Sequence, residues 1–260
     1  MSFRQSGSIK YYTCDELPSS KLIHGVFTRR GGVSPVPWDS LNLGGMNGDN
    51  NSNVIENRKR IFNSVGLPVD SIYDAWQVHG TDVICTDKPR PLDTAHLRAD
   101  AIITNTPGVT LFMRFADCVP IFLYDPNHHV IGMVHAGWIG TVQRLAGISV
   151  EVMGEKYKSL PEDIQAVIGP SIGPDHFQIG ADVEKKVKES FGLYSEDLLF
   201  RRDRKMFLDL WKANYYGLSD VGVKKIHGMG ICTACHLEDW YSHRGEHGNT
   251  GRFGALIALK

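Results

Sequence analysis

The sequence predicts an α/β protein of the α+β type, in which one domain holds a mixed, largely antiparallel sheet with flanking helices. Short segments rich in Ile, Val and aromatic residues follow one another with few helical segments between them, which argues against a doubly wound parallel sheet. No internal repeat and no Pro-, Gly- or Ser-rich linker divides the chain. We therefore expect a single domain over residues 1–260, with about the first 20 residues peripheral to it.

The expected elements follow from local periodicity. Strand segments hold β-branched and aromatic residues between turn formers, and helical segments repeat apolar residues at i, i+3 and i+4. By these signals, strands cover residues 22–28, 72–78, 83–86, 101–104, 109–115, 121–124, 130–135, 164–168, 224–229 and 253–258, and helices cover residues 54–65, 141–157, 181–190 and 207–217. The long loop 29–53 is dense in Gly, Pro, Asn and Ser, and loops of this length are often functional. Asn51, Ser52 or Asn53 is expected to cap the first helix.

Composition excludes several classes of partner. With 28 Lys and Arg against 29 Asp and Glu, the net charge is −1, and no basic stripe indicates a nucleic acid or a membrane surface. No apolar run approaches the roughly 20 residues that span a bilayer, and the N-terminus lacks the apolar core of a signal peptide. Five cysteines are an odd number and do not indicate a disulfide framework. We expect a cytoplasmic protein with free thiols; its oligomeric state stays open.

The segment 118–135 is expected to form a hairpin around the type I turn Asp-Pro-Asn-His at 125–128. A turn centred between residues 126 and 127 places Cys118 directly opposite His135, where β-carbons lie about 4.5–5.5 Å apart. Pro120 is the weak point, because it cannot donate to the ladder and can shift the register. The pair is either part of a site or an ordinary buried thiol beside a core histidine. The glycines that follow His135 leave room for a ligand.

His79 offers a third group at another strand end, in the turn of "WQVHGTDV". Taken alone, it also fits an ordinary turn histidine. If it joins Cys118 and His135, the set is His₂Cys, and three N/S ligands with an open fourth position are typical of catalytic zinc. Copper also accepts such donors. Without a metal, Cys118 and His135 could instead act as a thiolate nucleophile and its base.

At these residues the chain resembles a known family. The stretches "TRRGGVSPVPWDSLNLG", "VIENRKRI", "QVHGTDV", "ADCVPIFLYDP", "VHAGWIGTVQRLA", "IGPSIG" and "CTACHLEDWYSHRGEHGNTGRFGALI" occur in order from about Thr28 to the C-terminus. They resemble the laccase-domain family, also called the YfiH-like or polyphenol oxidoreductase family.

The resemblance implies a fold similar to the catalytic domain of cytotoxic necrotising factors and a zinc site of His79, Cys118 and His135. It implies a purine nucleoside phosphorylase that acts on adenosine, inosine, guanosine and methylthioadenosine with phosphate, and that also deaminates adenosine. A copper-linked polyphenol oxidoreductase and a peptidoglycan-editing accessory factor are alternatives described in the same family. Multicopper oxidation is poorly supported by the residues themselves, because the chain has no His-x-His pair.

Several polar residues match the family's motifs. Asp117, next to Cys118, is expected to orient a ligand or to act as an acid–base group. Binding of the nucleoside or of phosphate is expected from Arg30, Asn42, Arg58 and Gln77, although a solvated helix residue or a turn former fits Arg58 and Asn42 equally. The family usually reads "HAGWRG", and Ile139 replaces that arginine here, which puts phosphate use in question.

Two further motifs have weaker interpretations. Cys232-Thr-Ala-Cys235 fits a redox pair or half of a zinc site, and the lack of a second C-x-x-C excludes a Cys₄ ribbon. Cys232 is otherwise a buried thiol or a wall of the site. His243 and His247 lie four apart in a Gly-rich stretch, which predicts a surface loop and not a metal-binding helix.

Overall fold

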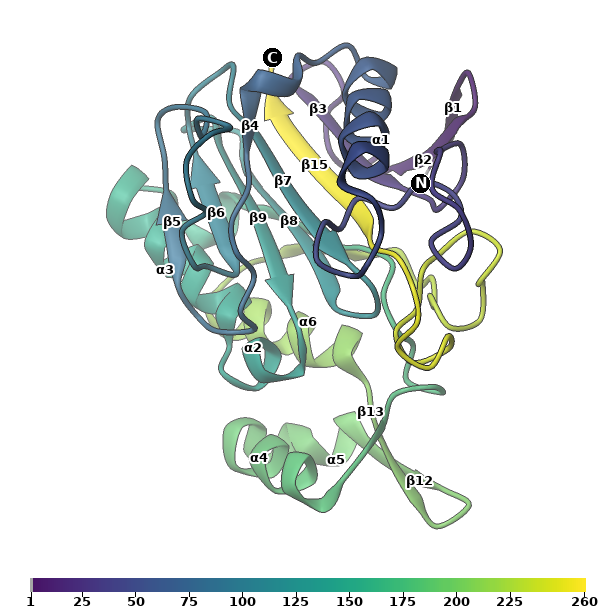
Figure 1. The fold of residues 1–260 in the computed structure, drawn as a ribbon. Helices are drawn as coiled ribbons and strands as arrows, with labels where there is room; N and C mark the ends of the chain where they lie inside the picture. The colour runs from purple at the N-terminus through teal and green to yellow at the C-terminus, as the bar shows by residue number, and fades with distance from the viewer. Residues whose placement is uncertain (1) are drawn as a thin grey trace.

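Two six-stranded sheets pack face to face at the centre of the molecule (Figure 1). The structure is a computed structural model, and it describes residues 2–260. The first sheet has the order β1 (Ser2–Ser6), β2 (Ile9–Thr13), β3 (Leu22–Phe27), β15 (Phe253–Leu259), β7 (Thr110–Phe115), β4 (Ile72–Tyr73). The second has the order β14 (Lys225–Gly228), β10 (Gln165–Ile168), β8 (Val119–Asp125), β9 (Val130–Ala136), β6 (Ala101–Thr104), β5 (Val83–Cys85).

Most neighbouring strands are antiparallel, and the pairs β4–β7, β5–β6 and β10–β14 are parallel. The predicted mixed α/β fold is therefore confirmed. The central strands β8, β9 and β15 are buried along their whole length, because one sheet face packs on the other sheet and the opposite face packs on helices. This double burial explains why their sequences are apolar at nearly every position and do not alternate.

Helices cover the outer faces of both sheets. Helix α1 (Asn51–Ser64) lies over the first sheet, where Ile61 and Phe62 pack with Phe112 and Leu256 (Figure 1). Helices α2 (Trp138–Val142), α3 (Leu145–Tyr157) and α6 (Leu210–Asp220) lie on the side of the second sheet. None of the helices among residues 2–260 is long and apolar enough to cross a membrane.

A smaller unit extends from the second sheet. It contains α4 (Ala181–Phe191), α5 (Ser195–Leu198) and a three-stranded sheet in the order β11 (Gln178–Ile179), β13 (Lys205–Leu208), β12 (Leu199–Arg202). Figure 1 shows this unit below the two central sheets. The sequence did not predict its strands. The charged residues "RRDRK" form the end of β12, the turn and the start of β13, so the apolar–polar alternation of a strand is not visible there. Strands β1 and β2 were missed for a similar reason, since β1 is mostly exposed and polar.

Two helix predictions need correction. The helix expected over 141–157 is two helices, because Arg144 adopts a left-handed φ of 62° and breaks the ladder. Its guanidinium lies 3.9 Å from the ring centre of Phe191 and donates to Asp220, contacts that no local pattern indicates. The helix expected over 207–217 is shifted toward the C-terminus and begins after Asp209, whose carboxylate accepts from the backbone N–H of Lys212.

Two smaller boundaries also differ from the prediction. The cap of α1 is Asn50, one position before the expected residues. The strand expected over 72–78 is only the two-residue β4, because the chain then turns away toward the loop that bears His79.

The register of the central hairpin also differs from the prediction. His135 pairs with Pro120, and Cys118 lies just before β8. The loop is residues 126–129, so its centre lies one position later than expected. The Asp125 carboxylate accepts the N–H groups of Asn127 and His128, and His129 takes a φ of 52°. This moves the expected partner of His135 by two positions, and a shift of two leaves each side chain on the face predicted for it.

Candidate functional site

A cavity of about 830 Å³ opens where the loops after β4, β7 and β9 meet the C-terminal segment. This volume suits a small-molecule ligand. The lining includes all three predicted donors, four arginines and three aromatic side chains: His79, Cys118, His135, Arg58, Arg114, Arg244, Arg252, Trp76, Trp138 and Phe177.

The three donors converge although they come from separate parts of the chain. One ligand atom from each of His79, Cys118 and His135 lies within 4.8 Å of the others. His79 is exposed in the loop between β4 and β5, Cys118 is half-buried before β8, and His135 is buried near the end of β9. The convergence predicted from sequence is therefore present, although the predicted register was wrong.

Gly137 makes this approach possible. A β-carbon at this position would lie 2.8 Å from His79 Cδ2 and 3.2 Å from Cys118 Sγ, which is too close for any larger residue without displacement of these groups. The glycine of "HAGW" is therefore a steric requirement of the three-donor cluster.

Asp100 fixes the orientation of two of the donors. Its fully buried carboxylate lies 2.8 Å from His135 Nδ1 and accepts the backbone N–H groups of Val78 and Gly80, on either side of His79. Burial alone would raise the pKa of Asp100, but these hydrogen bonds lower it, so the carboxylate is charged at neutral pH. His135 Nε2 is left for the cluster. A carboxylate that orients a ligating histidine is the usual support of a metal site.

Burial dominates the chemistry of Cys118. Burial, together with the neighbouring carboxylate of Asp117 and against the opposing effect of Arg252, raises the pKa of the thiol to about 12. In the absence of a cation, the group is therefore a thiol at neutral pH and a weak nucleophile.

Asp117 directs its carboxylate to the C-terminal segment. One oxygen accepts from Thr233 Oγ1 at 2.7 Å and the other from the Arg244 N–H at 2.6 Å. Asp117 itself has a left-handed φ of 82°. Both oxygens thus hold the segment that contributes Arg244 to the cavity wall.

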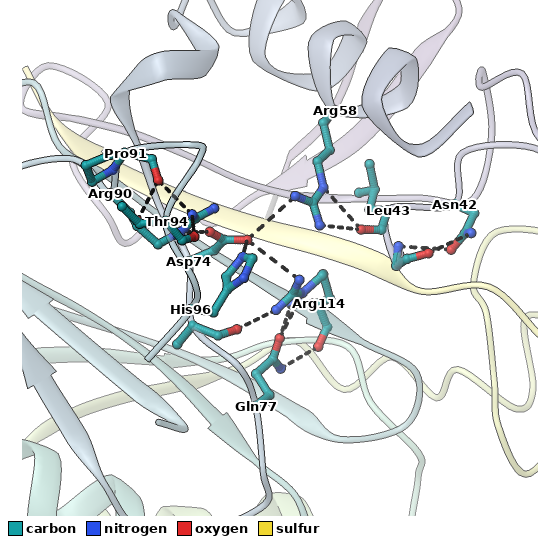
Figure 2. Close-up of polar contacts among 12 residues, drawn as sticks. Asn42, Leu43, Arg58, Asp74, Gln77, Arg90, Pro91, Thr94, His96 and Arg114 are labelled. Carbon is teal, nitrogen blue, oxygen red and sulfur yellow. Dashed lines mark hydrogen bonds and ion pairs between the residues drawn. The ribbon is translucent and has the colours of Figure 1, made fainter. Parts of the chain in front are cut away.

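A group of arginines surrounds a single buried carboxylate on another side of the cavity (Figure 2). Asp74 Oδ1 lies 2.9 Å from Arg90 Nε, and Oδ2 lies 3.6 Å from both Arg58 and Arg114. Burial would raise the pKa of Asp74, but His96 and the arginines lower it well below its usual range. Because the guanidinium groups outnumber the carboxylate, positive charge is in excess here, and Arg58 and Arg114 expose it to the cavity.

The predicted substrate residues divide into two groups. Arg58 and Gln77 line the cavity, and Gln77 exchanges hydrogen bonds with Arg114. Arg30 and Asn42 are not in the lining formed by residues 2–260: Arg30 pairs with Asp239 at 2.6 Å, and the fully buried Asn42 organises the long loop through Gly44 and Asp49. Ile139, which stands where the family usually has arginine, also lies outside this lining.

The sequence analysis missed Asp100, Asp74, Arg114 and Arg252. Arg114 had a usable signal, because a lone charge inside the apolar strand "TLFMRF" indicates a buried polar contact. Asp100 is detectable only from the pairing of β6 with β9, which places it beside His135.

Comparisons with known proteins identify the family of the chain. A family model described as "Multi-copper polyphenol oxidoreductase laccase" matches residues 23–260. The chain belongs to this family. The resemblance noted in the sequence is thereby confirmed. Similar proteins also carry the name purine nucleoside phosphorylase.

The chain is 37% identical to a "Purine nucleoside phosphorylase" of Deinococcus radiodurans, over 93% of this chain and 91% of that protein. It is 36% identical to "Purine nucleoside phosphorylase YlmD" of Bacillus subtilis, over 93% and 90%. Among solved structures, YlmD from Geobacillus stearothermophilus has a TM-score of 0.91 with 30% identity and covers 99% of this chain and 98% of that one. Bacillus licheniformis "hypothetical protein YfiH" has a TM-score of 0.92 with 31% identity, over 99% of both chains.

Proposed function

We propose that the protein is a zinc-dependent purine nucleoside enzyme that catalyses phosphorolysis of adenosine, inosine, guanosine and methylthioadenosine, and deamination of adenosine. The observation that supports it most is the juxtaposition, in one cavity, of a His₂Cys donor set and an excess of arginine. The relatives' name, purine nucleoside phosphorylase, supports the phosphorolysis of purine nucleosides.

The donor set fits a divalent cation. His79, Cys118 and His135 would hold it, Asp100 would keep His135 in the tautomer that presents Nε2, and Gly137 would leave the space. Two imidazoles and one thiolate with an open position suit zinc, and copper accepts the same donors. When bound, the cation would supply Lewis acidity beside the arginines, the chemistry that activates water for deamination.

The arginines fit the phosphate co-substrate. In phosphorolysis a phosphate oxygen attacks C1′ of the ribose, the C–N glycosidic bond breaks, and the purine leaves with a proton. Arg58 and Arg114 would hold the dianion by charge-assisted hydrogen bonds. Burial and the nearby Arg58 lower the pKa of Arg114 to about 10, so it remains cationic at neutral pH.

The aromatic side chains fit the purine. Trp76 is half-exposed at the cavity, and Phe177 lies in the wall beneath Arg244, whose guanidinium is 5.4 Å from its ring centre. A purine ring would stack on such faces. Asp117 would contribute by positioning Arg244, a role that its two hydrogen bonds favour over acid–base chemistry.

Product analysis on adenosine tests the proposal. With phosphate we expect adenine and ribose 1-phosphate, and without phosphate inosine and ammonia. His79→Ala should abolish both reactions and the zinc bound by His79, Cys118 and His135. His129→Ala is the matched control, because His129 is also exposed and has a similar φ of 52° against 59° for His79, but lies in the distant β8–β9 loop. No turnover of any purine nucleoside by the zinc-loaded protein would refute the proposal.

A metal-free hydrolase or amidase is the second candidate, because Asp100, His135 and Cys118 also have the order of a Cys-His-Asp triad. The two candidates differ at His79, which a triad does not require. Amide or ester hydrolysis that survives in His79→Ala and in chelator, but not in Cys118→Ser, would favour the hydrolase.

A further inference from the structure

We propose that the protein has a second, structural zinc site, formed by Asp175, His176, Cys232 and Cys235. One ligand atom of each lies within 4.8 Å of the others. This cluster shares no residue with the His79–Cys118–His135 cluster. Asp175 and His176 would supply the two ligands that the C-x-x-C motif needs to complete a zinc site.

Strand pairing brings the four residues together. Strands β10 and β14 are parallel neighbours, so their carboxyl ends reach the same edge of the second sheet. A bridge between Ser171 and Cys232 continues this pairing beyond the strands. Asp175 and His176 lie in the turn after β10, and Cys235 lies in the turn after Cys232. Two turns from adjacent parallel strands thus face each other.

Three of the distances between the donors match tetrahedral coordination. With Zn–S of about 2.3 Å and Zn–N of about 2.0–2.1 Å, a tetrahedral ion holds sulfur and nitrogen about 3.6 Å apart. His176 Nδ1 lies 3.6 Å from Cys235 Sγ and 3.7 Å from Cys232 Sγ. Cys235 Sγ lies 3.6 Å from Asp175 Oδ2, which is also the separation expected for sulfur and a carboxylate oxygen. Four protein donors close the coordination sphere, as in structural zinc sites.

Gly173 shapes the turn that brings the donors together. Its backbone N–H donates to Cys232 Sγ at 3.1 Å, which ties the turn after β10 to the C-x-x-C turn. A β-carbon on Gly173 would lie 2.8 Å from Asp175 Oδ1 and 3.1 Å from Cys232 Sγ. The turn "GPDH" therefore requires glycine for both donors to approach.

The site would fix one wall of the cavity. Thr233, inside the C-x-x-C turn, donates to Asp117 next to Cys118. Arg244 donates to the carbonyls of His176 and Gln178. An ion that joins the two turns would therefore hold Arg244 and Asp117 in place without contact with the substrate, which distinguishes it from the ion of the proposed function.

Metal content measured with zinc, and with cobalt as a coloured substitute, tests the site. The native chain, isolated under reducing conditions and loaded with each metal, is compared with Cys235→Ser, His176→Ala and the control Cys85→Ser, a half-buried thiol on β5. We expect Cys235→Ser and His176→Ala each to lose one equivalent of zinc, to weaken the thiolate-to-cobalt absorption and to lower the melting temperature of the zinc-loaded chain. Cys85→Ser should match the native chain.

Two results would overturn the proposal. One is zinc content and cobalt absorption in folded Cys235→Ser and His176→Ala equal to those of the native chain. The other is a native chain that binds no second ion although Cys232 and Cys235 are both free thiols by mass. Since His79→Ala should lose only the other equivalent and retain the absorption that Cys235 supplies, failure of one site is distinguishable from failure of the other.

Discussion

Asp100→Asn tests how Asp100 orients the proposed zinc ligands His79 and His135, and its effect follows from hydrogen-bond geometry. Oδ2 of Asp100 accepts N–H groups from Val78 and Gly80 at 3.1 and 2.7 Å, and Oδ1 faces His135 Nδ1 at 2.8 Å. In the variant, the amide oxygen keeps the two backbone donors, so the amide NH₂ must face His135. Nδ1 then has to accept, and the ring proton moves to Nε2, the atom required for a cation.

Loss of such a supporting carboxylate typically lowers metal affinity by about 10- to 100-fold, which is about 1.4–2.7 kcal/mol. We expect this loss in zinc titrations against a competing chelator, performed in a Cys235→Ser background so that only this cluster is measured. Asp125→Asn is the matched control. Asp125 is equally buried and also accepts two backbone N–H groups and faces a histidine Nδ1, but it lies at the end of β8. Equal zinc affinity in Asp100→Asn, Asp125→Asn and the background chain would refute the reasoning.

Three further variants test other parts of the site. Gly137→Ala should lower zinc affinity at least tenfold, because its β-carbon would overlap the donors, whereas Gly140→Ala, whose β-carbon meets nothing closer than 3.4 Å, should bind zinc normally in the same titration. Arg58→Ala should raise the KM for phosphate roughly 10- to 100-fold, the value of one charged hydrogen bond; an equal rise in Arg60→Ala, whose side chain pairs with Glu56 on the same helix, would contradict a phosphate role. Asp74→Asn should lower the free energy of unfolding by about 3 kcal/mol at neutral pH, since it leaves buried arginines unpaired. The folded pKa of Asp74 is depressed, so this stability is present above the unfolded pKa of about 3.9 and is lost as pH falls through the lower folded pKa. Denaturant unfolding of the native and variant chains at several pH values should show that their difference in free energy disappears on acidification. A difference that stays constant with pH would argue against the ion pairs.

The convergence of His79, Cys118 and His135 was predictable from the motifs that resemble the family, whereas the local pattern alone also fitted a turn histidine and a buried thiol. The face assignment in the β8–β9 hairpin survived an incorrect register, since the error was two positions and side chains alternate with period two. The polar residues behind the donors were not predictable in this way. Asp100 and Arg114 act through partners on other strands, and no local signal gives the order of strands in a sheet.

The sequence by itself determined the fold class, most strand positions, the family and the three donors, because periodicity, turn chemistry and motif order are local properties of the chain. Only the tertiary structure decided that two separate sheets pack together, that Arg30 and Asn42 lie away from the cavity, and that Cys232 and Cys235 face Asp175 and His176. The physical reason is that these facts depend on which distant strands pair, and pairing is set by burial of whole sheet faces and not by any short segment.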